Sequence, residues 1–218
     1  MKKLIIFFLG FSLLSGCTSL KGQSSDLEKF IQNVIQTYTN KDSKKFNQLI
    51  HEKNGLYIMT TIGPTTTWSN VKKVCLEQDC VKNKTAESLG VPYQDFLESY
   101  TSGKLNLNEI EYTGNAYFEC EEIEKQGVFV SSKNQYTALS DAIQFFRENF
   151  LSINGPTPDL EKKYEELDQL KTKIKNIEKT SHRVVVNSEN GTFIFYVTNL
   201  DGKWFLTIID FASADCSV

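Results

Sequence analysis

One carboxylate in this chain stands among residues that otherwise suit a buried strand. Asp210 lies near the end of the apolar segment Lys203–Phe211, close to the C-terminus. Alternation along a strand places Asp210 on the same face as Trp204 and Ile208. Burial there would raise the pKa of the carboxyl and suit it to proton transfer. The alternative, which we favour, is that Asp210 lies at the exposed end of the strand and pairs with a lysine or with the C-terminal tail.

The chain has two histidines, and neither stands in a recognisable catalytic motif. His51 lies in a polar turn after a helix, where it either takes part in catalysis or, more simply, interacts favourably with the helix C-terminus. His182 opens a strand and is expected at the surface. Phosphate-cradling glycine loops, nucleophile elbows and metalloprotease helices are missing from the sequence. We therefore assign no catalytic residue and expect no metal and no cofactor.

The N-terminus carries a different reactive group, the thiol of Cys17. Two lysines precede an apolar run over residues 4–14, which is too short to span a bilayer and fits the core of a signal peptide. Leu14-Ser15-Gly16-Cys17 then resembles the bacterial lipobox, in which the cysteine accepts a lipid and becomes the first mature residue. The resemblance implies a signal peptide over 1–16 and lipidation of Cys17. The alternative is an ordinary secretory signal with a chance cysteine.

The four other cysteines suit disulfides in an exported protein. We predict the bridge Cys75–Cys80, because the short segment between these residues closes easily in a loop. The remaining pair, Cys120–Cys216, would tie a mid-chain strand to the C-terminal tail. Two other pairings stay open. A zinc site is a further alternative, but the sequence has neither a His-x-His motif nor a second close cysteine pair to support it.

Composition limits the partners of the mature chain, which begins at Cys17. Removing the two lysines of the signal leaves 22 basic against 27 acidic residues, a net charge of −5. There is no basic block, so nucleic acid is not an expected partner. Beyond the signal, no apolar run is long enough to cross a bilayer, so we expect attachment to the membrane through the lipid alone. The residues directly after Cys17 are not acidic, which favours the outer membrane and its periplasmic side.

Helical periodicity and turn chemistry predict the elements of the N-terminal half. A tether over 17–25 leads to a capping box at Ser25–Glu28, where a long amphipathic helix is expected to begin. Asp42 should cap a second, shorter helix, and Leu56–Ile62 reads as a strand. The pattern weakens over 65–111, which we predict to be an insertion.

The second half of the chain is expected to contain a strand pair, at 116–123 and 127–131, and extra helices at about 137–179. The last of these helices has one apolar stripe, and its remaining face is almost all Lys and Glu. It either packs on its own domain, which we favour, or forms a short coiled coil with a partner. Asn-Gly and Asp-Gly turns then predict a three-stranded antiparallel meander. Its expected strands are His182–Asn187, Thr192–Thr198 and Lys203–Phe211.

Two helices, a strand and a closing meander with Asp201-Gly202-Lys203-Trp204 resemble the nuclear-transport-factor-two-like superfamily. The resemblance is best over Leu27–Gly63 and Val184–Phe211. It implies an α+β fold in which a bent antiparallel sheet wraps around the N-terminal helix as a cone, with inserted helices in the middle of the chain. Residues 26–218 would then form a single domain.

The resemblance also implies a place for chemistry, inside the cone. There Asp210 would meet Tyr38 or His51, and an acid with a phenol in an apolar cavity would polarise a carbonyl or move a proton, as in isomerases and dehydratases. Fold alone does not select an activity.

Three functions follow from these observations. We favour a lipid-anchored, non-catalytic module of the bacterial envelope that binds an envelope protein or a small apolar ligand. The first alternative is the isomerase or dehydratase built on Asp210. The second is a structural or assembly subunit that docks through helix 158–179, or as a homodimer through an exposed sheet face.

Overall fold

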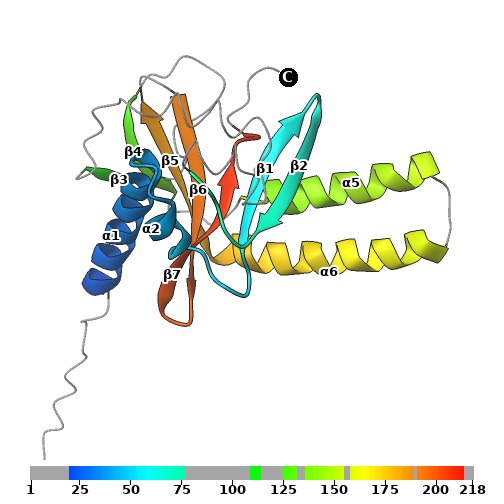
Figure 1. Cartoon of the computed structure of the whole chain (residues 1–218), viewed down its shortest axis with the longest axis horizontal. Coiled ribbons are helices and arrows are strands. Elements are labelled where there is room, and N and C mark those ends of the chain that lie inside the picture. Colours follow the sequence, from blue (N-terminus) through cyan, green and yellow to red (C-terminus); the bar gives the residue numbers. More distant parts are fainter. Residues whose placement is uncertain are drawn as a thin grey trace, which may run out of the picture.

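A computed structural model of the chain describes residues 20–76, 109–113, 125–131, 136–154, 158–188 and 191–213. These residues form an α+β fold in which one sheet lies between two layers of helices (Figure 1). The strands are β1 (Leu56–Ile62), β2 (Thr65–Val71), β3 (Ile110–Thr113), β4 (Gly127–Ser131), β5 (Ser181–Ser188), β6 (Gly191–Leu200) and β7 (Lys203–Asp210). The helices are α1 (Leu20–Thr39), α2 (Ser43–Asn47), α5 (Ala138–Asn154) and α6 (Pro158–Thr180).

The sheet has seven strands in the order β2-β1-β7-β6-β5-β4-β3. It is mixed, because β1 runs parallel to β7 and β3 runs parallel to β4. The sequence predicted an antiparallel sheet, and that prediction is wrong for these two pairs. Hairpin turns reveal only antiparallel neighbours. Parallel neighbours are connected through longer segments, and no short turn motif in the sequence identifies them.

The predicted meander is confirmed as β5, β6 and β7, which pair antiparallel in sequence order. The turn between β6 and β7 needs positive φ angles, and Asp201 and Gly202 supply them at 52° and 83°. The extra helices that we expected at about 137–179 are confirmed as α5 and α6. The cap of α2 is also confirmed, since the Asp42 carboxylate accepts a hydrogen bond from the backbone N–H of Lys45.

Two predictions in the N-terminal half differ from the structure. Helix α1 begins at Leu20, so Ser25 and Glu28 lie inside the helix and do not form its cap. Residues 65–71, placed in an insertion, form β2, which pairs with β1 along its whole length. Its sequence carries threonines where a central strand would carry apolar residues, as suits the edge of a sheet. The strand expected at 116–123 lies outside the described residues.

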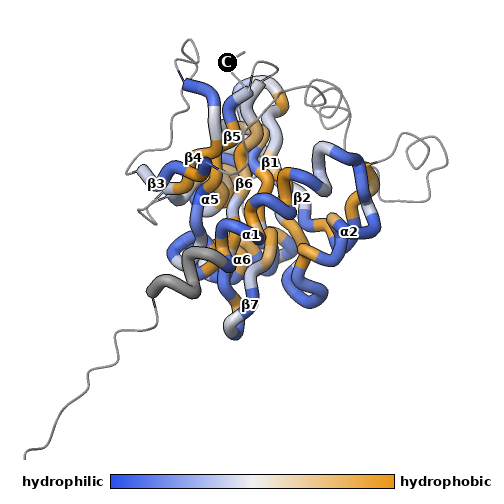
Figure 2. The backbone as a smooth tube through the Cα atoms, turned by 90° about the vertical axis from the view of Figure 1, so that its left-hand side faces the viewer, coloured by the Kyte–Doolittle hydropathy of each residue, from blue (hydrophilic) through white to orange (hydrophobic). Residues whose placement is uncertain are grey.

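Each face of the sheet has its own apolar core. Helices α1 and α2 pack on one face, with Ile31, Val34 and Phe46 against residues such as Val184 and Phe195. On the other face, α5 and α6 pack against a second cluster (Figure 1). This cluster contains Leu139, Ile143, Leu167, Ile174, Ile177, Val185, Ile194 and Ile208. The tube coloured by hydropathy shows apolar strands in the middle of the molecule (Figure 2).

The chain's own helices therefore cover both faces of the central strands. The second face is covered by α5 and α6, which lie where the sequence predicted inserted helices. Among the described residues, neither face of the central strands is left exposed for the homodimer contact that the sequence suggested. None of the helices in the described ranges is long and apolar enough to cross a membrane.

A β-bulge in β7 changes which side chains face which core. The register between β6 and β7 shifts at Tyr196/Val197, so that Thr207 becomes an extra residue. Before the bulge, Trp204 and Leu206 face the core on the α1 side. After it, Ile209 joins them, while Ile208 joins the core under α5 and α6. Strict alternation had predicted one face for Trp204, Leu206 and Ile208, and that prediction is wrong.

The tight entry to β1 gives a first test of the fold. Gly55 has φ +72°, and a Cβ at this position would lie 2.8 Å from the carbonyl oxygen of Val71. We expect Gly55→Ala to lower the free energy of unfolding by about 2 kcal/mol. Gly63→Ala is the matched control, because Gly63 has φ +57° and open space around it. It should lose only about 1 kcal/mol in urea denaturation, and equal losses would show that the contact with Val71 does not matter.

Candidate functional site

Asp210 is fully buried and is held by the turn that ends β7. Its carboxylate accepts hydrogen bonds from the backbone N–H of Ser213 at 2.8 Å and from the Ser213 hydroxyl at 2.7 Å. The Tyr196 hydroxyl lies 3.5 Å from the same carboxylate. The favoured prediction of an exposed Asp210 is therefore wrong, but the pairing with the C-terminal tail that it offered beside a lysine is seen at Ser213. The carboxylate instead closes a local turn inside the protein.

Tyr196 connects Asp210 to a second buried charge, Arg183. Burial raises the pKa of the Tyr196 phenol, and the Asp210 charge raises it further, whereas Arg183 lowers it. Arg183 and Tyr196 are directly opposite each other on β5 and β6. The guanidinium of Arg183 also lies 4.6 Å from the centre of the Tyr136 ring. The sheet face under α5 and α6 thus contains a buried polar cluster of both signs.

Tyr38 lies on the opposite face of the sheet from Asp210. Its ring is buried and stacks on Phe193 at 4.2 Å between ring centres, within the core under α1 and α2. Burial also raises the pKa of the Tyr38 phenol. The structure does not bring Tyr38 and Asp210 together, because the bulge at Thr207 sends Asp210 to the other face. The pair of Asp210 with Tyr38 that the cone resemblance implied is therefore not formed, and the phenol near Asp210 is that of Tyr196.

Both histidines pack against aromatic side chains, and neither lies beside Asp210. The Nδ1 atom of His51 accepts a hydrogen bond from the backbone N–H of Asn54 at 3.1 Å, and its ring makes an edge-to-face contact with Phe205, with 4.8 Å between the ring centres. His51 thus forms the turn before β1 and lies near the start of β7, whereas Asp210 ends that strand. His182 was expected at the surface but is half-buried, with its ring 5.6 Å from Trp204. Burial lowers the pKa of its imidazole.

Glu178 fastens α5 to α6 at the sheet. It is buried, and its Oε1 accepts the backbone N–H groups of Leu139 and Ser140 at 2.9 and 3.2 Å. These N–H groups belong to the first turn of α5, where a helix has no partners of its own. Burial raises the pKa of the Glu178 carboxyl. We did not single out Glu178, although its position four residues after Ile174 places it on the buried stripe of α6.

From this fixed base, α5 and α6 extend as an antiparallel hairpin well beyond the edge of the sheet (Figure 1). We call residues 145–154 of α5 and 158–168 of α6 the distal hairpin. Leu160 and Tyr164 are buried but do not belong to either sheet core. The Arg147 guanidinium lies 5.2 Å from the centre of the Tyr164 ring. The distal hairpin thus has contacts of its own.

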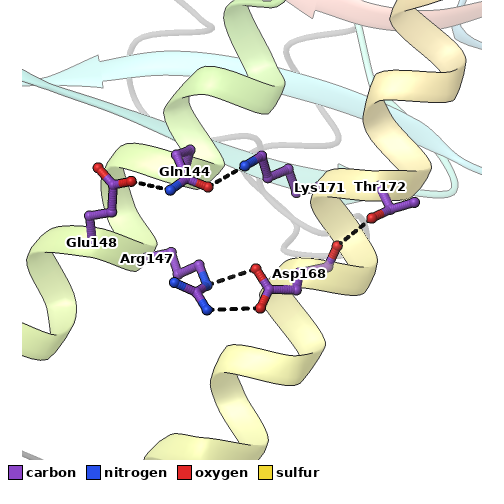
Figure 3. A network of polar contacts seen from close by, with 6 residues as sticks. All are labelled: Gln144, Arg147, Glu148, Asp168, Lys171 and Thr172. Atoms are coloured by element: carbon purple, nitrogen blue, oxygen red, sulfur yellow. Dashed lines mark hydrogen bonds and ion pairs between the residues drawn. The ribbon is translucent and has the colours of Figure 1, made fainter.

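Polar contacts hold the two helices together along the hairpin (Figure 3). The Nε atom of Arg147 lies 2.7 Å from Asp168, and the same guanidinium donates a second hydrogen bond to Asp168 at 2.9 Å. This bidentate geometry fixes both side chains. Gln144 accepts from Lys171 and donates to Glu148. Side-chain hydrogen bonds and an ion pair therefore connect α5 to α6 along the hairpin.

Among the side chains that the structure describes in the distal hairpin, one large apolar side chain is exposed beside several charged ones. Phe145 is 53% exposed, one of three large hydrophobic residues that the described part of the chain exposes. On α6, the buried residues form one stripe that faces α5 and the sheet, and the rest of the described surface of this helix is polar. Aromatic residues such as phenylalanine are enriched in the cores of protein interfaces. We therefore take the distal hairpin as the candidate functional site.

The cysteine predictions are only partly visible. Cys75 is disulfide-bonded. Its expected partner Cys80, the pair Cys120 and Cys216, and the lipid site Cys17 all lie outside the described residues. Within the described ranges, no group of three or more His, Cys, Asp or Glu side chains could hold a metal ion.

Comparisons of the chain with protein-family models, with curated proteins and with solved structures found no match. The fold and the sites themselves therefore define the class of protein. It is an α+β protein with a mixed sheet between two helical layers, and the layer formed by α5 and α6 extends beyond the sheet as a helical hairpin (Figure 1).

Proposed function

We propose that this chain is a lipoprotein of the bacterial envelope, anchored through Cys17, that acts as a non-catalytic interaction module. The observation that carries the proposal is the α5/α6 hairpin, which reaches beyond the sheet while its base is fixed by Glu178 (Figure 1). Phe145 offers a partner an apolar anchor on this hairpin. The polar side chains nearest to a catalytic arrangement, around Asp210, are instead used to close a turn.

Photo-crosslinking in the bacterial envelope tests the surface. Benzoylphenylalanine in place of Phe145 keeps an aromatic ring at the exposed site, and the same residue in place of Lys44, on α2, is the control. We expect light-dependent adducts from position 145 and none of the same mass from position 44. Identical adducts from both positions, or none from position 145, would contradict a partner surface on the hairpin.

The anchor has a separate test. Cys17→Ser removes the thiol that would accept the lipid, so we expect unprocessed precursor and the loss of radioactive palmitate from the chain. Palmitate labelling that persists in Cys17→Ser would refute lipidation at this residue. Membrane fractionation of cells that carry the wild-type chain tests the localisation, and we expect the chain in the outer membrane, on its periplasmic side.

We further propose that α1, α2, β1 and the meander form a cone related to the nuclear-transport-factor-two-like superfamily. The support is the core in which both N-terminal helices pack on one face of the sheet. The parallel pairs and the second helical layer would be additions to that cone. An experimental structure with a strongly bent sheet around α1 would support this relationship, and a flat sheet would contradict it.

A further inference from the structure

One face of α6 carries its charges in two blocks of opposite sign. Positions 161, 165, 168, 172, 175 and 179 are separated by alternating steps of four and three residues, so they form a single stripe along the helix. All six side chains are exposed. In chain order they are Glu161, Glu165, Asp168, Thr172, Lys175 and Lys179. We call the two glutamates and the two lysines the outer charges.

The outer charges form no ion pair with any residue that the structure describes. The middle of the stripe is different, because Asp168 binds Arg147 and also accepts the Thr172 hydroxyl through its backbone carbonyl (Figure 3). At each end of the stripe, like charges lie four residues apart and repel each other. The stripe therefore has two ends of opposite sign that no ion pair within the described ranges neutralises.

The helix dipole explains only part of this order. Acidic residues near a helix N-terminus and basic residues near its C-terminus are favourable, but the effect falls off within one turn. Glu165 lies two turns into α6, and Lys175 lies more than one turn before its end. The separation of charges thus extends further along α6 than the dipole requires.

The spacing of the outer charges is symmetric about Leu170. Glu165 and Lys175 both lie five residues from it, at about 7.5 Å along the axis, and Glu161 and Lys179 both lie nine residues from it, at about 13.5 Å. Two such helices placed antiparallel would therefore bring every glutamate opposite a lysine. A two-fold axis through the middle of the stripe generates this arrangement.

We propose that a second copy of this chain docks antiparallel along this stripe of α6, forming a two-fold symmetric dimer. Glu161 and Glu165 of each copy would face Lys179 and Lys175 of the other. The inference rests on the proposed function, because exposed ion pairs are individually weak and a shared membrane anchor raises the effective concentration. The dimer should dissociate with added salt, since exposed charges are screened over about 10 Å at 0.1 M.

Sedimentation of the full lipidated chain in detergent tests the pairing through charge reversal. Glu161→Lys with Glu165→Lys makes the stripe entirely basic at its ends, and Lys175→Glu with Lys179→Glu makes it entirely acidic. Each double variant should weaken the dimer at least tenfold. The two variants mixed should form a heterodimer, and the quadruple variant with all four charges exchanged should dimerise again. Circular dichroism of each variant confirms that α6 is intact.

Several results would overturn the dimer. These are a monomeric wild-type chain at about 100 µM in low salt, double variants that dimerise as the wild type does, or a mixture that stays monomeric. If a double variant misfolds, Glu165→Gln with Lys175→Gln replaces it and should weaken the dimer by a smaller factor. Position 145 crosslinked to a different protein, with a monomeric chain, would refute the dimer and leave the proposed function standing. A dimeric chain without any adduct from position 145 would refute a partner surface around Phe145 and leave the dimer standing.

Discussion

Asp210→Ala is expected to lower the free energy of unfolding by about 3 kcal/mol, as large an effect as any single change considered for this chain. The substitution removes the acceptor for the backbone N–H and the hydroxyl of Ser213. It also removes one of the two carboxyl groups, Asp210 and Glu178, that act together with the buried Arg183 on the Tyr196 phenol. Urea denaturation followed by tryptophan fluorescence measures the loss.

Two variants separate the charge of Asp210 from its shape. Asp210→Asn keeps one acceptor oxygen and nearly the same volume, so we expect a loss of about 1–2 kcal/mol. Ser213→Ala removes a single donor and should lose about 1 kcal/mol. If Asp210→Ala differs from the wild type by less than about 0.5 kcal/mol, the buried turn does not hold the end of β7, and the account given for this residue fails.

Glu178→Ala should have a comparable effect, of about 3 kcal/mol, for a different reason. It leaves the N–H groups of Leu139 and Ser140 without their acceptor at the buried start of α5. We expect the amide protons of these two residues to exchange faster with solvent, and the hairpin to detach from the sheet more often. Glu178→Gln keeps the acceptor oxygen and should lose only about 1 kcal/mol. Lys179→Ala, at the exposed next position, should be close to neutral.

The stability contributed by Glu178 should also depend on pH. Burial raises the pKa of its carboxyl above the ordinary value of 4.5, so the folded protein holds this proton more tightly than the unfolded chain does. The favourable contribution is complete below pH 4.5 and is lost as the pH rises through the raised pKa of the folded state. Relative to Glu178→Gln, the wild type should therefore become less stable between acidic and neutral pH. A wild type that gains on Glu178→Gln over this range would contradict the raised pKa.

Local chemistry accounts for the elements that were predicted correctly. Pro158 in the first turn and a regular apolar stripe define α6, and Asp201-Gly202 defines the turn between β6 and β7. In each case a few neighbouring residues determine the backbone, so the pattern is readable without the fold. Strand β2 was missed because its threonines satisfy an edge position, which exists only once β1 is beside it.

The candidate sites were harder to predict because distant residues create them. The bulge at Thr207 accompanies a chain of hydroxyl contacts, to Thr198 at 2.8 Å and from there to Ser181 at 2.6 Å. These residues come from three strands, and after this bulge Asp210 faces Tyr196 and not Tyr38. Strand alternation alone cannot reveal such a change, because one extra residue reverses the face of every side chain after it.

The sequence by itself determined the α+β class, the helix pair and the meander, because these follow from short-range periodicity and turn geometry. It also predicts the lipid at Cys17, since a lipobox is a linear motif. Only the tertiary structure decided that helices cover both faces of the sheet and that α5 and α6 reach beyond its edge (Figure 1). The reason is physical: burial and pairing depend on which distant segments meet, and the free energy of those contacts is not encoded in any one stretch of the chain.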